Sequence, residues 1–192
     1  MSPDKRHAIL DAARARFYHY GIRKTTMQEV ARDAGLAVGT LYLYFEDKDD
    51  LVVACAEEFA GHHRAQAEAI LASRAAPNKK LRKYLLARYA ICKEIGTGSR
   101  HASELAREVI RLKPDRLADE AAIMERTILA CLEEGVRSGA FHIPDPARDA
   151  RVLLISVAYF FPNATMTIDR WPPETGLKML LDWFIETWSK RT

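Results

Sequence analysis

The sequence predicts an all-α protein of about nine helices, and three observations support this prediction. Apolar residues recur at steps of three and four along most of the chain, which is the period of an amphipathic helix. The 9 glycines and 8 prolines among 192 residues are few and gather at breaks between the periodic runs. Hydrophobic residues make up 48% and charged residues 29%, as is ordinary for a folded protein. We expect an N-terminal domain over residues 1–48 and a second domain over residues 49–192.

The first helix is expected to begin with Ser2 as its cap and Pro3 at the first helical position, where a missing amide costs nothing. Ile9 and Phe17 follow at helical spacing, and Gly21 is expected to end the helix. We expect this helix to pack across the next two helices and to bury Phe17 between them.

Residues 26–45, TMQEVARDAGLAVGTLYLYF, have the pattern of two short helices joined by a tight turn. Thr26 and Glu29 form a capping box, in which the threonine oxygen accepts an amide of the first turn and the glutamate accepts the cap amide. Gly35 stands where the first of these helices must end, in the left-handed conformation that glycine adopts at little cost. This arrangement is typical of a helix-turn-helix, whose second helix enters the DNA major groove. An ordinary helical hairpin within a globular core is the alternative.

These residues resemble the DNA-binding domain of the TetR family of one-component bacterial repressors. The resemblance covers residues 5–52 and is specific as a set, although each piece is weak by itself. It implies an N-terminal three-helix, helix-turn-helix DNA-binding domain followed by a helical domain that binds a ligand and dimerises. The matching pieces are Phe17 with Gly21, Thr25-Thr26, Val30-Ala31, Ala34-Gly35-Leu36, Gly39-Thr40-Leu41-Tyr42, Tyr44-Phe45, and Lys48 with Leu51.

The helix-turn-helix suggests two sets of DNA contacts. Small residues at the start of the second helix let the backbone approach base edges, and a glutamine can pair with an adenine edge. Simple capping is the alternative for Thr26, and both roles can hold together. We expect base contacts from Gln28, Val38, Gly39, Thr40 and Tyr44. The resemblance implies phosphate contacts from Thr25, Thr26, Tyr42 and Lys48.

The central helices are less informative about function. Asp47, followed by Asp50 three residues later, is expected to cap the fourth helix. The adjacent His62 and His63 diverge by about 100° on a helix, so they cannot share one metal ion. We expect no metal and no cofactor. Helices are predicted over residues 47–72, 79–95, 101–112 and 115–138.

The last two helices, predicted over residues 147–161 and 173–190, are expected to form a dimer interface. The run VLLISVAYFF is apolar nearly all round, and such a helix must be buried on every side. We expect both helices to pair with their copies in a four-helix bundle, as the resemblance also implies. A monomer that folds both helices into its own core is the alternative. The expected interface residues are Leu154, Val157, Ala158, Phe161, Leu177, Leu181, Phe184 and Trp188.

The resemblance also implies a small-molecule pocket between the fourth helix and the four helices that follow it. The mixture of aromatic, sulfur and arginine side chains suits an apolar effector with one acidic or polar end. Ordinary core packing is the alternative, and a salt bridge to Glu57 or Glu58 would explain Arg88 without any ligand. The candidate pocket residues are Phe59, His62, Tyr84, Arg88, Tyr89, Cys92, Met124, Ile128 and Tyr159.

Charge and cysteine content limit the remaining possibilities. The net charge is only +3, and residues 1–48 hold eight Lys/Arg against six Asp/Glu, so the argument for DNA rests on shape rather than on bulk charge. Three widely spaced cysteines without a signal peptide indicate a reducing cytoplasm. The longest apolar run, residues 152–161, is about half of what a bilayer span needs, so we expect no membrane segment.

Together these features predict a ligand-responsive transcriptional regulator. We expect a repressor that binds a palindromic double-stranded DNA operator as a homodimer and is released by a small-molecule effector. Two alternatives stay open: a helical scaffold that never touches DNA, and a redox sensor. A redox sensor would need an exposed, low-pKa thiol at Cys55, Cys92 or Cys131. We do not expect an enzyme, because no Ser/His/Asp order, phosphate loop or metal spacing occurs.

Overall fold

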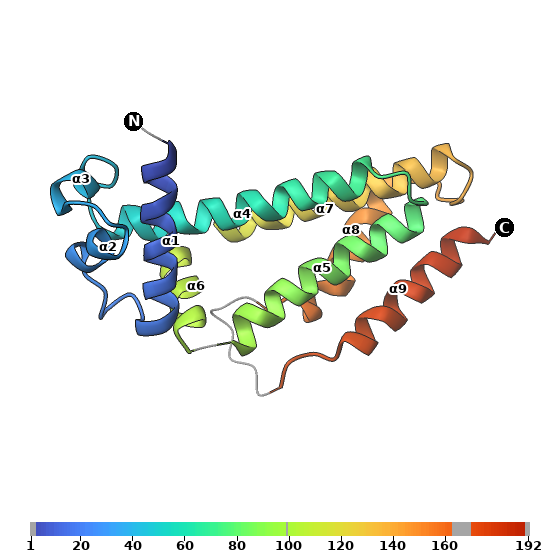
Figure 1. Cartoon of the computed structure of the whole chain (residues 1–192). Coiled ribbons are helices and arrows are strands. Elements are labelled where there is room, and N and C mark those ends of the chain that lie inside the picture. The colour runs from blue at the N-terminus through green and yellow to red at the C-terminus, as the bar shows by residue number, and fades with distance from the viewer. Residues whose placement is uncertain (1–2, 99, 163–169, 191–192) are drawn as a thin grey trace. The chain divides into compact units, whose positions relative to one another are not determined.

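The computed structural model of the chain describes residues 3–98, 100–162 and 170–190 (Figure 1). Within these residues the backbone is helical and contains no strand, which confirms the all-α prediction. Nine α-helices and one short 3₁₀-helix are described: α1 (Pro3–Tyr20), α2 (Met27–Asp33), α3 (Val38–Tyr42), α4 (Lys48–Ala72), α5 (Pro77–Thr97), α6 (Arg100–Leu112), α7 (Arg116–Arg137), α8 (Pro146–Val157), η1 (Ala158–Phe160) and α9 (Glu174–Ser189).

The chain packs into two compact units, and its path crosses between them more than once. The first unit contains residues 1–63 and 98–116, and the second contains residues 64–97 and 117–192. The long helix α4 therefore contributes its N-terminal part to the first unit and its C-terminal part to the second. The boundary expected at residue 48 remains a prediction for the limit of the DNA-binding domain.

The core of the first unit forms where α1 meets α2, α3 and the start of α4. Phe17 of α1 is fully buried there, as its helical spacing predicts. Each large apolar side chain in such a core contributes about 1.5–3 kcal/mol through burial. The other fully or nearly fully buried members include Ile9, Leu10, Ala13, Val30, Ala31, Leu41, Phe45, Leu51 and Val52.

Glycine closes α1, and α6 packs against this end. Gly21 has φ +83°, a conformation that L side chains rarely adopt. A Cβ atom at this position would lie 2.7 Å from Nδ1 of His101 on α6, which is too close. Gly35 after α2 also lies in the left-handed region, with φ +69°. The two glycine stops predicted for this segment are therefore confirmed, while the predicted cap at Ser2 falls outside the described residues.

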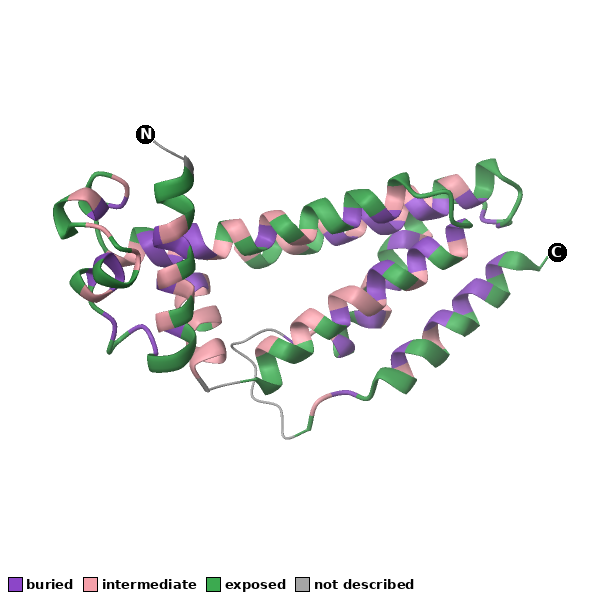
Figure 2. Ribbon diagram, viewed as in Figure 1, coloured by how far each residue is buried: buried purple, intermediate pink, exposed green. Residues whose placement is uncertain are grey.

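The second unit has a core of its own, built from α5, α7, α8 and α9 and the C-terminal part of α4. Figure 2 shows buried and exposed residues alternating along α9, as expected for a helix with one face on this core. One buried charge is neutralised within the unit, because Lys80 Nζ lies 2.8 Å from both carboxylate oxygens of Glu134. The fully buried members of the core include Leu81, Leu85, Ile128, Cys131, Leu132, Leu153, Leu177 and Leu181.

Two expected helices are shorter than predicted. The helix expected over residues 147–161 ends as an α-helix at Val157 and continues as η1. Pro162 accounts for this change, because a proline ring clashes with the carbonyl four residues earlier in an α-helix. Likewise α3 ends at Tyr42, so Tyr44 lies beyond the helix that was expected to carry it.

The residues predicted for the dimer interface require a correction. Five of them, Val157, Leu177, Leu181, Phe184 and Trp188, are buried in the core of their own unit and cannot meet a partner there. Trp188 is also held inside the chain, since its Nε1 donates to Asp149 at 2.9 Å. Of the others, Leu154 and Phe161 are half-buried and Ala158 is exposed. When a helix is apolar on every side, its sequence alone does not show which face packs against the core of its own chain.

The apolar side chains that α8, η1 and α9 do expose lie on other faces. Ile155 is 70% exposed and Tyr159 67%, while on α9 Met179 is 72% exposed and Trp183 60%. Val152 belongs to the same stripe as Ile155 and Tyr159, because the three are spaced by three and four residues. No helix in the described part of the chain is long and apolar enough to cross a membrane.

Candidate nucleic-acid interface

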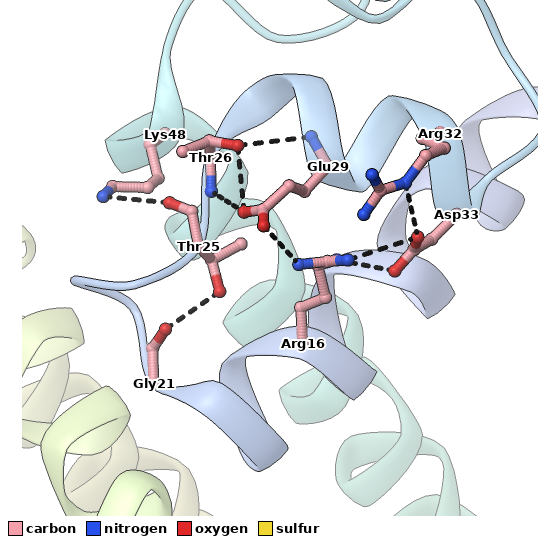
Figure 3. A network of polar contacts seen from close by, with 8 residues as sticks. All are labelled: Arg16, Gly21, Thr25, Thr26, Glu29, Arg32, Asp33 and Lys48. Atoms are coloured by element: carbon pink, nitrogen blue, oxygen red, sulfur yellow. Dashed lines mark hydrogen bonds and ion pairs between the residues drawn. The ribbon is translucent and has the colours of Figure 1, made fainter.

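The capping box predicted at the start of α2 is present. The backbone N–H of Thr26 and its hydroxyl both donate to Glu29 Oε2 at 2.9 Å, and the backbone N–H of Glu29 donates to Thr26 Oγ1 at 3.3 Å (Figure 3). The hydrogen bond from the Thr26 backbone is the main reason that the pKa of Glu29 lies below its ordinary value. The carboxylate is therefore charged at neutral pH and fixes the first turn of α2.

Arg16 of α1 holds both ends of α2. Its Nε donates to Asp33 in the last turn at 2.5 Å, and its Nη1 lies 3.1 Å from Glu29 in the first turn (Figure 3). The bond with Asp33 raises the pKa of Arg16, and the same bond lowers the pKa of Asp33. The Arg16 side chain is only 12% exposed, so this contact fixes how α2 lies on α1.

The connector between α1 and α2 is held by two residues that we expected at DNA phosphates. Thr25 is buried, and its hydroxyl donates to the carbonyl of Gly21 at 2.9 Å. Lys48 donates from Nζ to the carbonyls of Ile22 at 3.0 Å and Thr25 at 3.3 Å. The prediction of a phosphate contact from the Thr25 hydroxyl is therefore corrected, because that hydroxyl faces inward and shapes the connector. Lys48 keeps one further N–H for another acceptor, since an ammonium group has three.

The outward face of the helix-turn-helix is formed by the remaining predicted contact residues. Val38 is 38% exposed and Tyr42 48%, and Gly39, Gln28 and Thr26 are exposed as well. Leu41 of α3 is fully buried, so it anchors α3 with Val38, Gly39 and Tyr42 exposed to solvent. Thr40 is half-buried. Tyr44 is also half-buried and packs against the core of the unit, which limits how far it reaches toward a base.

Sequence reasoning overlooked Leu43, which follows α3 directly. Its side chain is 75% exposed, although leucine is apolar. The spacing of the apolar residues could have indicated this exposure. Leu41 and Phe45, both buried, are four residues apart, so the residue midway between them lies on the opposite side of a helical turn. Leu43 thus adds an apolar side chain to the outward face beside Tyr42.

The predicted effector pocket is not brought together as expected. Phe59 and His62 are exposed residues of α4 in the first unit, and Phe59 makes an edge contact with the ring of His63 at 4.3 Å. Tyr159 is exposed on η1, so its assignment to an interior pocket is corrected. Tyr89 is buried and donates its hydroxyl to the Pro172 carbonyl at 2.6 Å. Within the second unit, Tyr84, Met124 and Ile128 are buried core residues, while Arg88 and Cys92 are half-buried.

Arg88 has a partner other than the two that were proposed. Its Nη2 lies 3.1 Å from Glu120 of α7, whereas Glu57 pairs with Arg116 and Glu58 with Arg14. The Arg88 Nε atom is buried and has no hydrogen-bond acceptor among the described residues. This nitrogen can therefore accommodate one more polar group.

A cavity occurs in the first unit, away from the predicted pocket residues. Its volume is about 590 Å³, and none of the nine candidates lines it. The lining combines three arginines and two glutamates with one isoleucine: Ile22, Arg23, Glu104, Arg107, Glu108 and Arg111.

The cysteines do not have the properties of redox sensors. Burial raises the pKa of Cys55 and of Cys131 to about 12, and burial also raises the pKa of Cys92. A reactive sensor thiol needs the opposite shift together with access to solvent. Nothing at these three positions therefore supports the redox-sensing alternative.

Comparison with known proteins agrees with the helix-turn-helix. Residues 9–55 match the family model described as bacterial regulatory proteins, tetR family. The chain is 27% identical over 158 residues to the uncharacterized HTH-type transcriptional regulator YhgD of Bacillus subtilis, a match that covers 80% of this chain and 81% of YhgD.

Solved structures share the fold of the whole chain. A transcriptional regulator from Cytophaga hutchinsonii superimposes with a TM-score of 0.76 at 21% identity, over 97% of this chain and 99% of that chain. SmeT, the repressor of the Stenotrophomonas maltophilia multidrug efflux pump SmeDEF, gives a TM-score of 0.66 at 20% identity over 97% and 93% of the two chains. SmeT has also been solved in complex with triclosan. The capped and braced helix-turn-helix and the match of residues 9–55 to the family model identify this segment as a DNA-binding domain of the TetR type, and the whole chain shares the all-α fold of the solved regulators.

Proposed function

We propose that the protein is a repressor that binds a near-palindromic operator as a homodimer and leaves it when a small molecule binds. The observation that carries this proposal is the exposed face of α3, which is anchored by buried Leu41 and packs on α2, the helix that Arg16 joins to α1. A helix presented in this way fits the DNA major groove. As a repressor of bacterial genes the protein would act in the cytoplasm.

The proposed DNA contacts fall into two groups. Gln28, Val38, Gly39 and Thr40 contact base edges, with apolar Leu43 available to a thymine methyl group. Tyr42 and the third N–H of Lys48 contact phosphates, which fix the position of the protein without reading the sequence. Thr26 serves as the cap of α2, because its backbone N–H and its hydroxyl both donate to Glu29.

The dimer is proposed to form through the exposed stripe of α8 and η1 together with that of α9. Val152, Ile155 and Tyr159 form the first stripe, and Met179 and Trp183 form the second. Both helices pack on the same core, so a two-fold axis would bring four helices together in one bundle. Exposed apolar area of this extent is costly in water, and a second copy would cover it.

The effector is proposed to be a largely apolar small molecule with one acidic or polar end. Its polar end would meet Arg88, whose buried Nε lacks an acceptor among the described residues and whose Nη2 is held by Glu120. SmeT, which shares the fold, binds triclosan, an example of a small ligand in this architecture. Release of DNA requires that the effector bind one state of the dimer more tightly than the other.

Electrophoretic mobility shifts with the DNA that flanks the protein's own gene test the proposal. We expect retardation at nanomolar to micromolar protein, against little retardation of an unrelated duplex of equal length. Tyr42→Phe should weaken binding to all duplexes alike, whereas Gln28→Ala should change the preference between them. Equal binding of both duplexes by the wild-type protein, or binding of neither, would contradict the proposed function.

A further inference from the structure

Arg6, in the first part of α1, lies over the ring of Phe45, the buried residue just beyond α3. The guanidinium carbon is 5.6 Å from the ring centroid, a distance typical of a cation–π contact. Phe45 is only 3% exposed, and Arg6 is exposed. The guanidinium thus lies over an aromatic ring that belongs to the core, while the Arg6 residue as a whole is exposed to solvent.

The charge of Arg6 is not neutralised by an ion pair in the part of the chain that the structure describes. Among the described residues no carboxylate pairs with it, although most other arginines of the first unit, such as Arg14, Arg16 and Arg111, do form ion pairs. Its place near the start of α1 does not serve the helix either, because positive charge there opposes the helix dipole. An unneutralised cation that lies over an aromatic ring is suited to an anion from outside the chain.

The position of Arg6 indicates what kind of anion it could bind. Phe45 follows Tyr42, the last residue of α3, and Leu43, and both of these residues are exposed. The guanidinium therefore lies at this end of the helix-turn-helix and within the same compact unit. The other end of α1 meets α6, since His101 packs against Gly21. A helix in the major groove has sugar-phosphate backbone at its ends, because the groove is only about 12 Å wide.

We propose that Arg6 binds a DNA phosphate and thereby extends the nucleic-acid interface from the helix-turn-helix to the start of α1. This inference rests on the proposed function. Arginine suits the task because its planar group can stack on Phe45 and still present two parallel N–H donors to a phosphate. The contact positions the protein on DNA and does not distinguish base sequences.

The test compares Arg6→Ala with Arg107→Ala, using fluorescence anisotropy with the flanking-gene duplex and an unrelated duplex over a range of salt concentrations. Arg107 is the matched control, because it is an exposed arginine of the same unit on α6 with no ion pair described. For Arg6→Ala we expect weaker binding to both duplexes and a slope of log K against log salt that is smaller by about one for each bound subunit. Arg107→Ala should keep the wild-type slope, and Arg6→Lys should recover most of it.

Each outcome of this comparison either supports or contradicts a phosphate contact by Arg6. The inference is wrong if Arg6→Ala has the same DNA affinity and the same salt slope as Arg107→Ala. It is also wrong if Arg6→Ala loses DNA affinity and thermal stability while its salt slope stays at the wild-type value, because Arg6 then serves only packing on Phe45. Arg6→Gln, which keeps the stem and a planar end, replaces Arg6→Ala if circular dichroism shows that the alanine variant is unfolded. Wild-type protein that binds no duplex would overturn the proposed function itself, and with it this role of Arg6.

Discussion

Arg16 shows how one side chain can support the position of α3, the second helix of the helix-turn-helix. It contacts carboxylates in the first and the last turn of α2, and α2 in turn supports α3. Loss of this side chain removes the ion pairs with Glu29 and Asp33 that join α2 to α1, although the apolar contacts of Phe17 remain. Its removal should therefore loosen the helix-turn-helix more than it changes the rest of the chain.

We predict that Arg16→Ala lowers the thermal midpoint by roughly 2–5 °C and weakens DNA binding, because α2 is less firmly placed. Calorimetry and anisotropy measure the two effects. Arg32→Ala is the control: Arg32 also lies near Asp33, at 3.6 Å, but its side chain is 71% exposed. An Arg32→Ala variant that loses as much as Arg16→Ala would show that the exposed pair, and not the bridging one, supports α2.

The same residues predict a pH dependence. The folded pKa values of Glu29 and Asp33 lie below their ordinary values of 4.5 and 3.8, so both groups bind protons less readily in the folded state. Their stabilising contribution is therefore complete above about pH 4.5 and is lost as the pH falls through the lowered pKa values. Urea unfolding between pH 3 and 7 should show this decline, and it should be smaller in Arg16→Ala. An unchanged decline in the variant would assign the acid sensitivity to other carboxylates.

The helices themselves were largely predictable, because their signals are local. The Thr26–Glu29 box and the glycines at 21 and 35 act over a few residues, and the structure has them where the sequence placed them. The orientation of α8 and α9 about their own axes was not predictable, since both are apolar on more than one face and only tertiary packing selects the inner one. For the same reason the inward-facing hydroxyl of Thr25 and the Glu120 partner of Arg88 could not be found from spacing alone.

The exposed stripes of α8 and α9 give a prediction for these elements. If the protein forms the proposed dimer through these stripes, Ile155→Glu with Trp183→Glu should convert it to a monomer with little loss of stability, because both side chains are exposed in the single chain. Sedimentation velocity gives the subunit number. Val136→Glu on α7 is the control, as a charge at an exposed valine outside the stripes should leave the dimer intact.

A core substitution on α9 completes this test. Leu181→Ala should destabilise the folded chain by about 2–5 kcal/mol, since it opens a cavity in the core of the second unit. Urea unfolding measures that loss. If the double glutamate variant remained dimeric, the partner surface would have to be sought away from these two helices.

At the scale of the whole molecule, the proposed homodimer predicts a strict operator geometry. Two reading helices related by a two-fold axis need half-sites about one helical turn apart, roughly 10 base pairs. Inserting about 5 base pairs between the half-sites moves the second one to the opposite side of the duplex. We predict that this insertion reduces affinity to that of a single half-site in anisotropy titrations. Undiminished binding to the lengthened duplex would mean that each subunit reads DNA independently.

The division of the chain into units has a practical consequence for anyone who wishes to build hybrid regulators. The unit that carries the helix-turn-helix includes residues 98–116, so the chain leaves it at α4 and returns to it as α6. A transplant that cut the gene once, after residue 63, would remove the side chain of His101 that covers Gly21 and the buried Val109. Chimeras should therefore exchange residues 1–63 and residues 98–116 together, so that α6 comes from the same protein as the helix-turn-helix.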